Sequence, residues 1–190
     1  MTARNLLLLG APGAGKGTQA VRLAARLGVP HVSTGDLLRA AVAAGTPLGL
    51  EARRYMDRGE LVPDGIVIGV AAERLARPDA KTGFVLDGFP RTVAQAEALD
   101  AELTRLGAKL DRCLALVTDE AALVARLLKR AQIEGRTDDN EATIRHRMKV
   151  YRSQTEPLIA CYQRKGVLRE IDGMGTIEEV ERRIQKELGA

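Results

Sequence analysis

The sequence predicts an α/β protein with an open, doubly wound sheet of five parallel strands and helices on both faces. Three observations indicate this fold: five short apolar runs, segments of helical periodicity between them, and a glycine-rich turn directly after the first run. Short continuous apolar runs are typical of parallel strands buried on both faces. Right-handed crossovers then place helices on both faces, and ligands bind beyond the carboxyl ends of the strands.

The predicted elements follow one another in a regular order along most of the chain. The strands are Asn5–Leu9, Pro30–Ser33, Phe84–Leu86, Arg112–Val117 and Val167–Ile171. The helices, several opened by Asp, Thr or Pro and closed by Gly, are Gly15–Leu27, Thr34–Ala43, Leu48–Arg58, Asp64–Ala76, Thr92–Leu106, Asp119–Gln132, Glu141–Lys165 and Ile177–Leu188.

Two segments depart from simple strand–helix alternation. Three successive helices lie between Thr34 and Ala76 without an intervening strand, which indicates a subdomain that stands off the sheet. The polar stretch Glu134–Asn140 contains one glycine and is predicted to be a loop between two helices, which suits a small lid.

Length and composition indicate one globular domain rather than a disordered chain. The chain has 190 residues, of which 45% are hydrophobic and 28% are charged. Arginine supplies 22 of the 29 cationic side chains, and its planar donors suit anionic ligands. The net charge of +4 is spread along the chain, and there are no Trp, 3 Tyr and 2 Phe, so a nucleic-acid-binding surface is disfavoured.

Cysteine usage and hydropathy indicate an intracellular protein. Cys113 and Cys161 lie far apart and neither belongs to a CxxC pair, so we expect reduced thiols and no zinc site. The apolar run Leu6–Leu9 is too short for a signal sequence or a membrane span. We therefore expect a cytoplasmic protein without membrane contact.

The most specific motif is GAPGAGKGT at Gly10–Thr18, which joins the first predicted strand to a helix. Glycines let consecutive backbone N–H groups curve around an anion, the helix N-terminus adds partial positive charge, and Lys16 reaches the outer phosphates. The motif therefore predicts a phosphate-binding loop. The strict pattern has Ser or Thr directly after the lysine, but here Gly17 intervenes before Thr18, so a magnesium contact from Thr18 stays open.

Charged residues at other predicted strand ends and helices support phosphoryl transfer. Asp87 follows the apolar run Phe84–Leu86, as the carboxylate of a Walker B strand does. Arg91 and Gln95 lie four apart on one helix face, and Arg126 and Arg130 repeat this spacing. Like charges four apart on a helix repel unless an anion lies between them, and Arg136 and Arg147 follow farther along the chain, so the four arginines together indicate binding of several phosphates. His31 and His146 are interpreted as structural or surface residues.

Taken together, these motifs resemble the adenylate kinase family along essentially the whole chain. The most specific blocks are GAPGAGKGTQ at Gly10–Gln19, STGDLLR at Ser33–Arg39, LDGFPRTVAQA at Leu86–Ala96, GRTDDN at Gly135–Asn140 and TEPLI at Thr155–Ile159. The resemblance implies one P-loop NTPase-like domain with a core of about residues 1–32, 63–129 and 140–190. It also implies an AMP-binding helical segment at 33–62 and a short lid at about 130–139.

The resemblance also implies roles for individual residues. ATP contacts would come from Gly13, Ala14, Gly15, Lys16, Gly17, Thr18, Arg126, Arg130 and Gly175. AMP contacts would come from Thr34, Arg39, Glu60, Leu61, Val62, Gly88, Phe89, Pro90, Arg91, Gln95, Arg136 and Arg147. Catalysis would depend on Lys16, Arg91, Arg126, Arg130, Arg136 and Arg147, while Asp36 and Asp87 would hold Mg²⁺ through water.

Two positions depart from some members of the family. Glu60 stands where some members have Lys or Gln, but the implied contact is through the main chain, so little effect is expected. The lid is short, with five residues between Arg130 and Arg136, and it contains no cysteine, so the structural zinc of some long-lid relatives is excluded.

The implied activity is reversible, Mg²⁺-dependent transfer of the terminal phosphoryl group from ATP to AMP, giving two ADP, by a monomer that binds neither nucleic acid nor membrane. A UMP/CMP kinase of the same fold is the nearest alternative, although Thr34 and Gln95 resemble the adenine-accepting versions. A non-enzymatic nucleotide-binding regulator or a nucleic-acid-binding protein is the alternative from another class. A small GTPase is disfavoured because no NKxD-type guanine motif is present.

Overall fold

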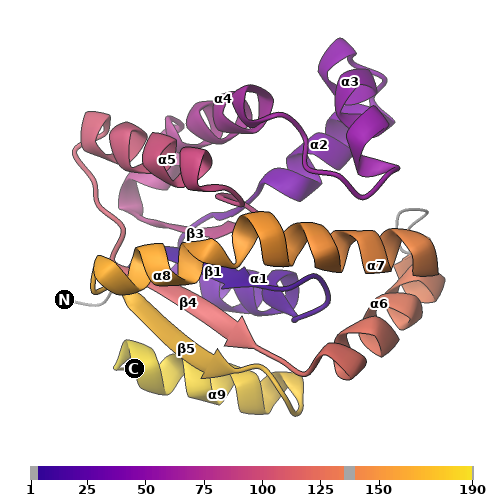
Figure 1. The fold of residues 1–190 in the computed structure, drawn as a ribbon. Coiled ribbons are helices and arrows are strands. Elements are labelled where there is room, and N and C mark those ends of the chain that lie inside the picture. The colour runs from indigo at the N-terminus through magenta and orange to yellow at the C-terminus, as the bar shows by residue number, and fades with distance from the viewer. Residues whose placement is uncertain (1–3, 135–139, 190) are drawn as a thin grey trace.

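A computed structural model describes residues 4–134 and 140–189 of the chain. Its five strands form one parallel sheet in the order β2-β3-β1-β4-β5, which confirms the predicted fold class (Figure 1). The strands are β1 (Asn5–Gly10), β2 (His31–Ser33), β3 (Phe84–Asp87), β4 (Arg112–Val117) and β5 (Leu168–Asp172). The chain moves to one side of β1 for β2 and β3 and to the other side for β4 and β5, so a binding crevice is expected at the carboxyl end of β1.

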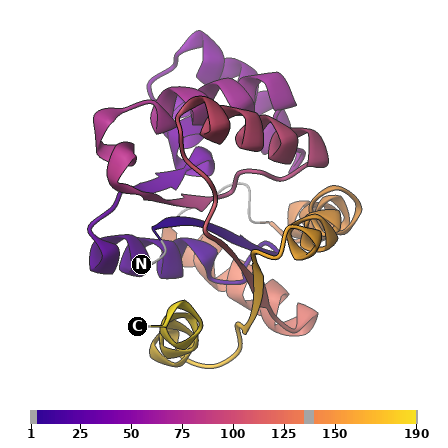
Figure 2. The same cartoon turned by 90° about the vertical axis from the view of Figure 1, so that its left-hand side faces the viewer.

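Helices cover both faces of this sheet. They are α1 (Lys16–Leu27), α2 (Thr34–Ala43), α3 (Pro47–Met56), α4 (Asp64–Leu75), α5 (Val93–Arg105), α6 (Glu120–Glu134), α7 (Glu141–Val150), α8 (Pro157–Arg164) and α9 (Ile177–Leu188). Figure 2 shows the sheet between two helical layers, with α9 in yellow on one side and the magenta helices of residues 64–105 on the other. No helix in the described ranges is long and apolar enough to cross a membrane.

Alternating side chains of the strands build two separate hydrophobic cores. In β1, Leu7 and Leu9 pack in one core, whereas Leu6 and Leu8 pack in the other. The first core holds side chains from α4, α5 and α8, and the second holds side chains from α1 and α9. This is the alternation expected of a strand buried on both faces.

The predicted strands and most helices agree with the structure to within two residues, but the single helix predicted at Glu141–Lys165 is wrong. The chain forms α7, a π-helical turn η2 (Tyr151–Thr155) and then α8. Pro157 has no N–H to donate to the carbonyl four residues before it, and its ring crowds that carbonyl. The turn instead closes through a bond from the Glu156 N–H to the Tyr151 carbonyl, with an N···O distance of 2.9 Å. A short 3₁₀ turn, η1 (Pro78–Thr82), was not predicted.

Candidate active site

The glycine-rich loop runs from the end of β1 to the start of α1 and forms one wall of a cavity. Gly13 and Gly15 have φ values of +84° and +89°, which favour glycine. At Gly13 a Cβ atom would also lie 2.9 Å from the Leu123 carbonyl oxygen. The Lys16 ammonium donates hydrogen bonds to the carbonyls of Gly10 and Ala11, at 2.7 and 2.9 Å, so it lies across the loop. The loop therefore has the backbone form that its sequence predicts.

The cavity beside this loop has a volume of about 610 Å³, within the range of roughly 300–1,000 Å³ common for small-molecule sites. We call it the larger cavity. Ten of the residues predicted to bind ATP or magnesium line it: Gly13, Ala14, Gly15, Lys16, Gly17, Thr18, Asp36, Asp87, Arg126 and Gly175. Both terminal nitrogens of Arg126 lie 3.3 Å from the Gly173 carbonyl oxygen, which holds this guanidinium at the cavity wall.

Asp87 ends β3 at the floor of the larger cavity. Burial acts to raise the pKa of its carboxyl, but His31, Lys16 and Arg91 outweigh that effect and hold this pKa below its ordinary value. Asp87 is therefore an anion at neutral pH. Its carboxylate faces Gly17, where a Cβ atom would lie 3.5 Å from Oδ2.

His31 also lines the larger cavity, which residue-by-residue sequence reasoning missed. Its Nε2 lies 3.8 Å from Asp87 Oδ2, beyond hydrogen-bond distance, and has no hydrogen-bond partner among the described residues. The signal that could have revealed this position is the pairing of β2 with β3, because His31 lies beside Val85, two positions before Asp87. His146 is exposed on α7, as expected for a surface residue.

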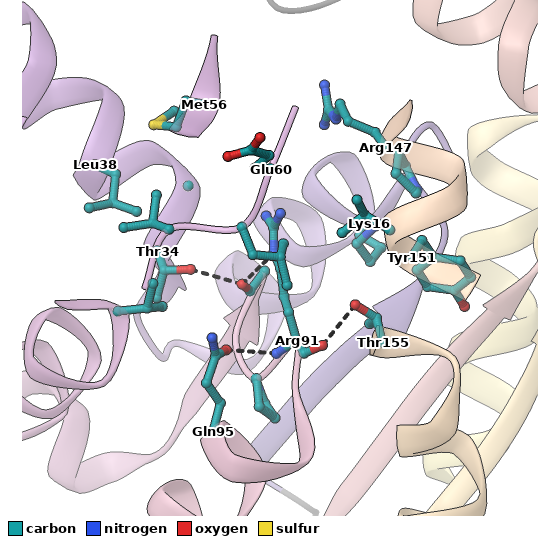
Figure 3. A pocket seen from close by; sticks show the side chains of 18 of the residues that line it. Lys16, Thr34, Leu38, Met56, Glu60, Arg91, Gln95, Arg147, Tyr151 and Thr155 are labelled. Carbon is teal, nitrogen blue, oxygen red and sulfur yellow. Dashed lines mark hydrogen bonds between the residues drawn. The ribbon is translucent and has the colours of Figure 1, made fainter. Parts of the chain in front are cut away.

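A second, smaller cavity lies between α2, the 59–62 segment, α7 and the chain that enters α5. Figure 3 shows Thr34, Leu38 and Met56 on one side of it and Arg147, Tyr151 and Thr155 on the other, with Arg91 between them. The residues predicted to bind AMP that line it are Thr34, Arg39, Glu60, Leu61, Val62, Gly88, Pro90, Arg91, Gln95 and Arg147. Phe89 does not line it; this side chain is buried in the first core.

Hydrogen bonds fix the wall of the smaller cavity around Arg91. The Gly88 carbonyl accepts from the Thr34 hydroxyl at 2.9 Å and from Arg91 Nε at 2.8 Å (Figure 3). The Arg91 carbonyl accepts from the Thr155 hydroxyl at 2.8 Å, across 64 positions of the sequence. Arg91 is thus held both by Gly88, three positions before it, and by Thr155 from a distant part of the chain.

The two cavities meet at a common group of cationic side chains. Lys16, Arg39, Arg91 and Arg147 line both of them. The predicted contribution of Arg136 lies outside the described residues, and so do the side chain of Arg130 and residues 135–139 of the predicted lid. Four cations at the junction of two cavities favour two anionic groups that approach each other there.

A parallel sheet with a glycine-rich loop at its first strand, and cations shared by two adjoining cavities, defines a P-loop phosphotransferase. Comparison with known proteins gives the family. The family model described as adenylate kinase matches residues 8–167. The adenylate kinase of Thermobifida fusca is 57% identical over 94% of each chain. That of Thermodesulfovibrio yellowstonii is 52% identical over 92% of this chain and 94% of its own, and that of Pseudarthrobacter chlorophenolicus is 49% identical over 97% and 96%.

The chain belongs to the adenylate kinase family. Its predicted family, fold class and enzyme class are therefore confirmed.

Proposed function

We propose that this enzyme transfers the terminal phosphoryl group of ATP to AMP, reversibly and with Mg²⁺, to give two ADP. The observation that carries this proposal is the set of four cations that line both cavities. ATP would occupy the larger cavity, with its phosphates on the N–H groups of residues 13–18. AMP would occupy the smaller cavity, with its phosphate at the junction.

In the transfer, an anionic phosphate oxygen of AMP attacks the terminal phosphorus of ATP. A new P–O bond forms there, and the bond to the bridging oxygen of the departing ADP breaks. AMP phosphate is already ionised at neutral pH, so no general base is required. The protein instead has to align two polyanions, neutralise their repulsion and exclude water. Lys16, Arg91 and Arg147 line both cavities, where the two sets of phosphates would converge.

The donor set at the larger cavity fits magnesium held mainly through water. Asp36 and Asp87 both line this cavity, and no cluster of three or more metal-binding side chains occurs in the described part of the chain. Mg²⁺ keeps several waters and is commonly held by one or two carboxylates together with substrate phosphates. When bound, the ion would neutralise part of the phosphate charge. The low pKa of Asp87 keeps this carboxylate ionised for that purpose.

The segment 33–62 would close over AMP and the lid at about 130–139 over ATP, since mobile covers exclude water in many kinases. The roles of Arg130 and Arg136 stay predictions. We further propose that the enzyme acts as a cytoplasmic monomer. Free thiols at Cys113 and Cys161 support a reducing compartment.

A direct assay tests the proposed reaction. Purified protein is mixed with Mg²⁺, ATP and either AMP, UMP, CMP or GMP, and nucleoside diphosphate formation is measured. We expect AMP to give the highest kcat/KM. Faster phosphorylation of UMP or CMP would support the pyrimidine kinase instead, and no product with any acceptor would overturn the enzyme assignment.

Binding measurements separate an enzyme from a binding protein. An analogue in which phosphates link two adenosines should bind tightly, because it fills both cavities and the junction at once. Weak binding of this analogue, together with steeply salt-dependent binding of DNA or RNA, would favour a nucleic-acid-binding protein.

A further inference from the structure

The amide of Gln95 is held between two partners at the wall of the smaller cavity. Gln95 lies in the first turn of α5, and only 1% of its surface is exposed. Its Oε1 accepts a hydrogen bond from the Arg91 N–H at 2.8 Å (Figure 3). Its Nε2 donates to Asp64 Oδ1 at 2.7 Å. Both ends of the amide therefore have a partner within the protein.

These two partners permit only one orientation of the amide. The Arg91 backbone N–H can only donate, and an ionised carboxylate can only accept. Rotating the amide by 180° would place its oxygen against the Asp64 carboxylate and its NH₂ group against the Arg91 N–H. After both bonds are made, one N–H proton and one oxygen lone pair remain for a ligand, and their relative positions are fixed.

Asp64, which accepts the hydrogen bond from Gln95, is itself held in place by a second hydrogen bond. Its other carboxylate oxygen, Oδ2, accepts from the Thr92 hydroxyl at 3.0 Å. It is the first residue of α4, where a carboxylate is favoured by the helix dipole. Asp64 does not line the smaller cavity, whereas Gln95 does. Asp64 therefore does not contact a ligand in this cavity directly, and of its two bonded partners only Gln95 lines the cavity.

We propose that Asp64 is a positioning residue that sets which nucleobase the smaller cavity accepts, by fixing the orientation of the Gln95 amide. This inference rests on the proposed function, in which the base of AMP meets Gln95. Adenine presents an amino donor beside a ring-nitrogen acceptor, whereas hypoxanthine presents an oxo acceptor beside an N–H donor. A fixed amide distinguishes these opposite edges, but an amide that can turn over accepts both.

Asp64→Asn tests the proposal, because a neutral amide at position 64 can donate or accept, so that only the bond from the Arg91 N–H still opposes the turned-over orientation of Gln95. We would measure kcat and KM for AMP and for IMP at saturating ATP. A well-formed bidentate pair contributes about 1–3 kcal/mol of base discrimination, or about 5–150-fold. We expect the AMP/IMP ratio of kcat/KM to fall by about tenfold in Asp64→Asn, mainly through the KM for AMP, while the KM for ATP is unchanged.

The matched control is Glu73→Gln, the same chemical change on the same helix. Glu73 is exposed and pairs only with Arg77 among the described residues, at 3.4 Å. This control should keep the wild-type AMP/IMP ratio. An unchanged ratio in Asp64→Asn, or an equal loss of activity with both acceptors, would overturn the positioning role.

A second measurement covers the case in which Asp64→Asn does not fold. In ¹⁵N-labelled wild-type protein, the Gln95 amide proton that is bonded to Asp64 should be protected from solvent exchange without AMP. Exchange as fast as that of an exposed glutamine side chain would overturn the proposal. If wild-type protein makes no ADP from ATP and AMP, the proposed function fails instead, whatever the state of the Gln95 amide.

Discussion

The two cavities that share Lys16 are built in different ways. The phosphate loop in the wall of the larger cavity takes its form from the backbone, through glycines with positive φ. The wall of the smaller cavity is shaped by side-chain hydrogen bonds, such as those from Thr34 to Gly88 and from Thr155 to Arg91. Backbone N–H groups suit phosphate, which every nucleotide carries, whereas oriented side chains suit a particular base. The smaller cavity should therefore hold most of the base selectivity.

The largest expected effect comes from a cation common to both cavities. Lys16→Ala should lower turnover by about 10²–10³-fold, because it removes charge from the junction of the two cavities, where we propose that the phosphates meet. Arg91→Ala should act in the same direction. The measurement is steady-state ADP formation, with thermal unfolding to show that each variant remains folded.

Lys129→Ala is the matched control, because Lys129 lines only the larger cavity. The loss of turnover in Lys129→Ala should be many times smaller than the loss in Lys16→Ala. Equal losses in the two variants would contradict a special role for the shared cations.

The next largest effect is a loss of folding stability at high pH, caused by a buried thiol in the first hydrophobic core. Burial raises the pKa of the Cys113 thiol from 9.0 to about 12. Between these values the native state keeps a proton that the unfolded state loses, so stability present below pH 9 is lost as pH rises. At pH 10.5 the loss from this group should be about 2 kcal/mol.

Urea unfolding at pH 7.5 and 10.5 checks this expectation in wild type and Cys113→Ala. The wild type should lose about 2 kcal/mol more between the two pH values than the variant. Identical losses would show that this thiol does not titrate as its burial requires.

A smaller effect, on the KM for AMP, is expected from a substitution at Gly59, where the 33–62 segment contacts α7. Gly59 has a φ of +72°, and a Cβ atom there would lie 2.9 Å from Arg147 Cγ and from Thr143 Cγ2. Gly59→Val should separate these parts and raise the KM for AMP by about tenfold, equivalent to about 1.4 kcal/mol. The KM for ATP should not change, and both constants are read from the same assay.

Gly45→Val separates backbone strain from this contact. Gly45 has a similar φ of +65°, but a Cβ atom there would meet nothing within 4 Å. A rise in the KM for AMP in both variants would indicate strain alone.

The smallest effect is expected from Thr34→Val. This change removes one of two hydrogen bonds to the Gly88 carbonyl, and the bond from Arg91 Nε remains. A lost hydrogen bond costs about 1 kcal/mol, so the KM for AMP should rise about fivefold. Thr34→Ser keeps the hydroxyl and should restore the wild-type value, which titration with AMP would check.

Local patterns were sufficient to predict the sheet and the phosphate loop. A buried strand such as Arg112–Val117 is apolar along its length, and its ends are marked by polar residues or glycine, so its bounds follow from composition. The break at residues 151–155 was missed although Pro157 signals it, because proline is disfavoured inside a helix and tolerated at its first position. The contact from Thr155 to Arg91 is tertiary and has no local signal in the sequence.

In the candidate site, too, some residue pairs could be predicted from the sequence and others could not. Lys16 and Asp87 follow strands that end at one edge of the sheet, so their proximity follows from topology. The proximity of His31 to Asp87 and of Asp64 to Gln95 depends on how neighbouring elements pack. Such pairs have no fixed spacing in the sequence, and so no motif signals them.

The π-helical turn between α7 and α8 also sets which side chains of α8 face the core, relative to the face that α7 turns toward the cavities. One additional residue in a turn rotates the following helix by about 100° relative to a continuous α-helix. With that rotation, Arg147 faces the cavities while Leu158 and Tyr162 are fully buried in the core. A chain that gained or lost one residue between these helices would exchange cavity-lining positions for core positions, which restricts where this region tolerates changes in length.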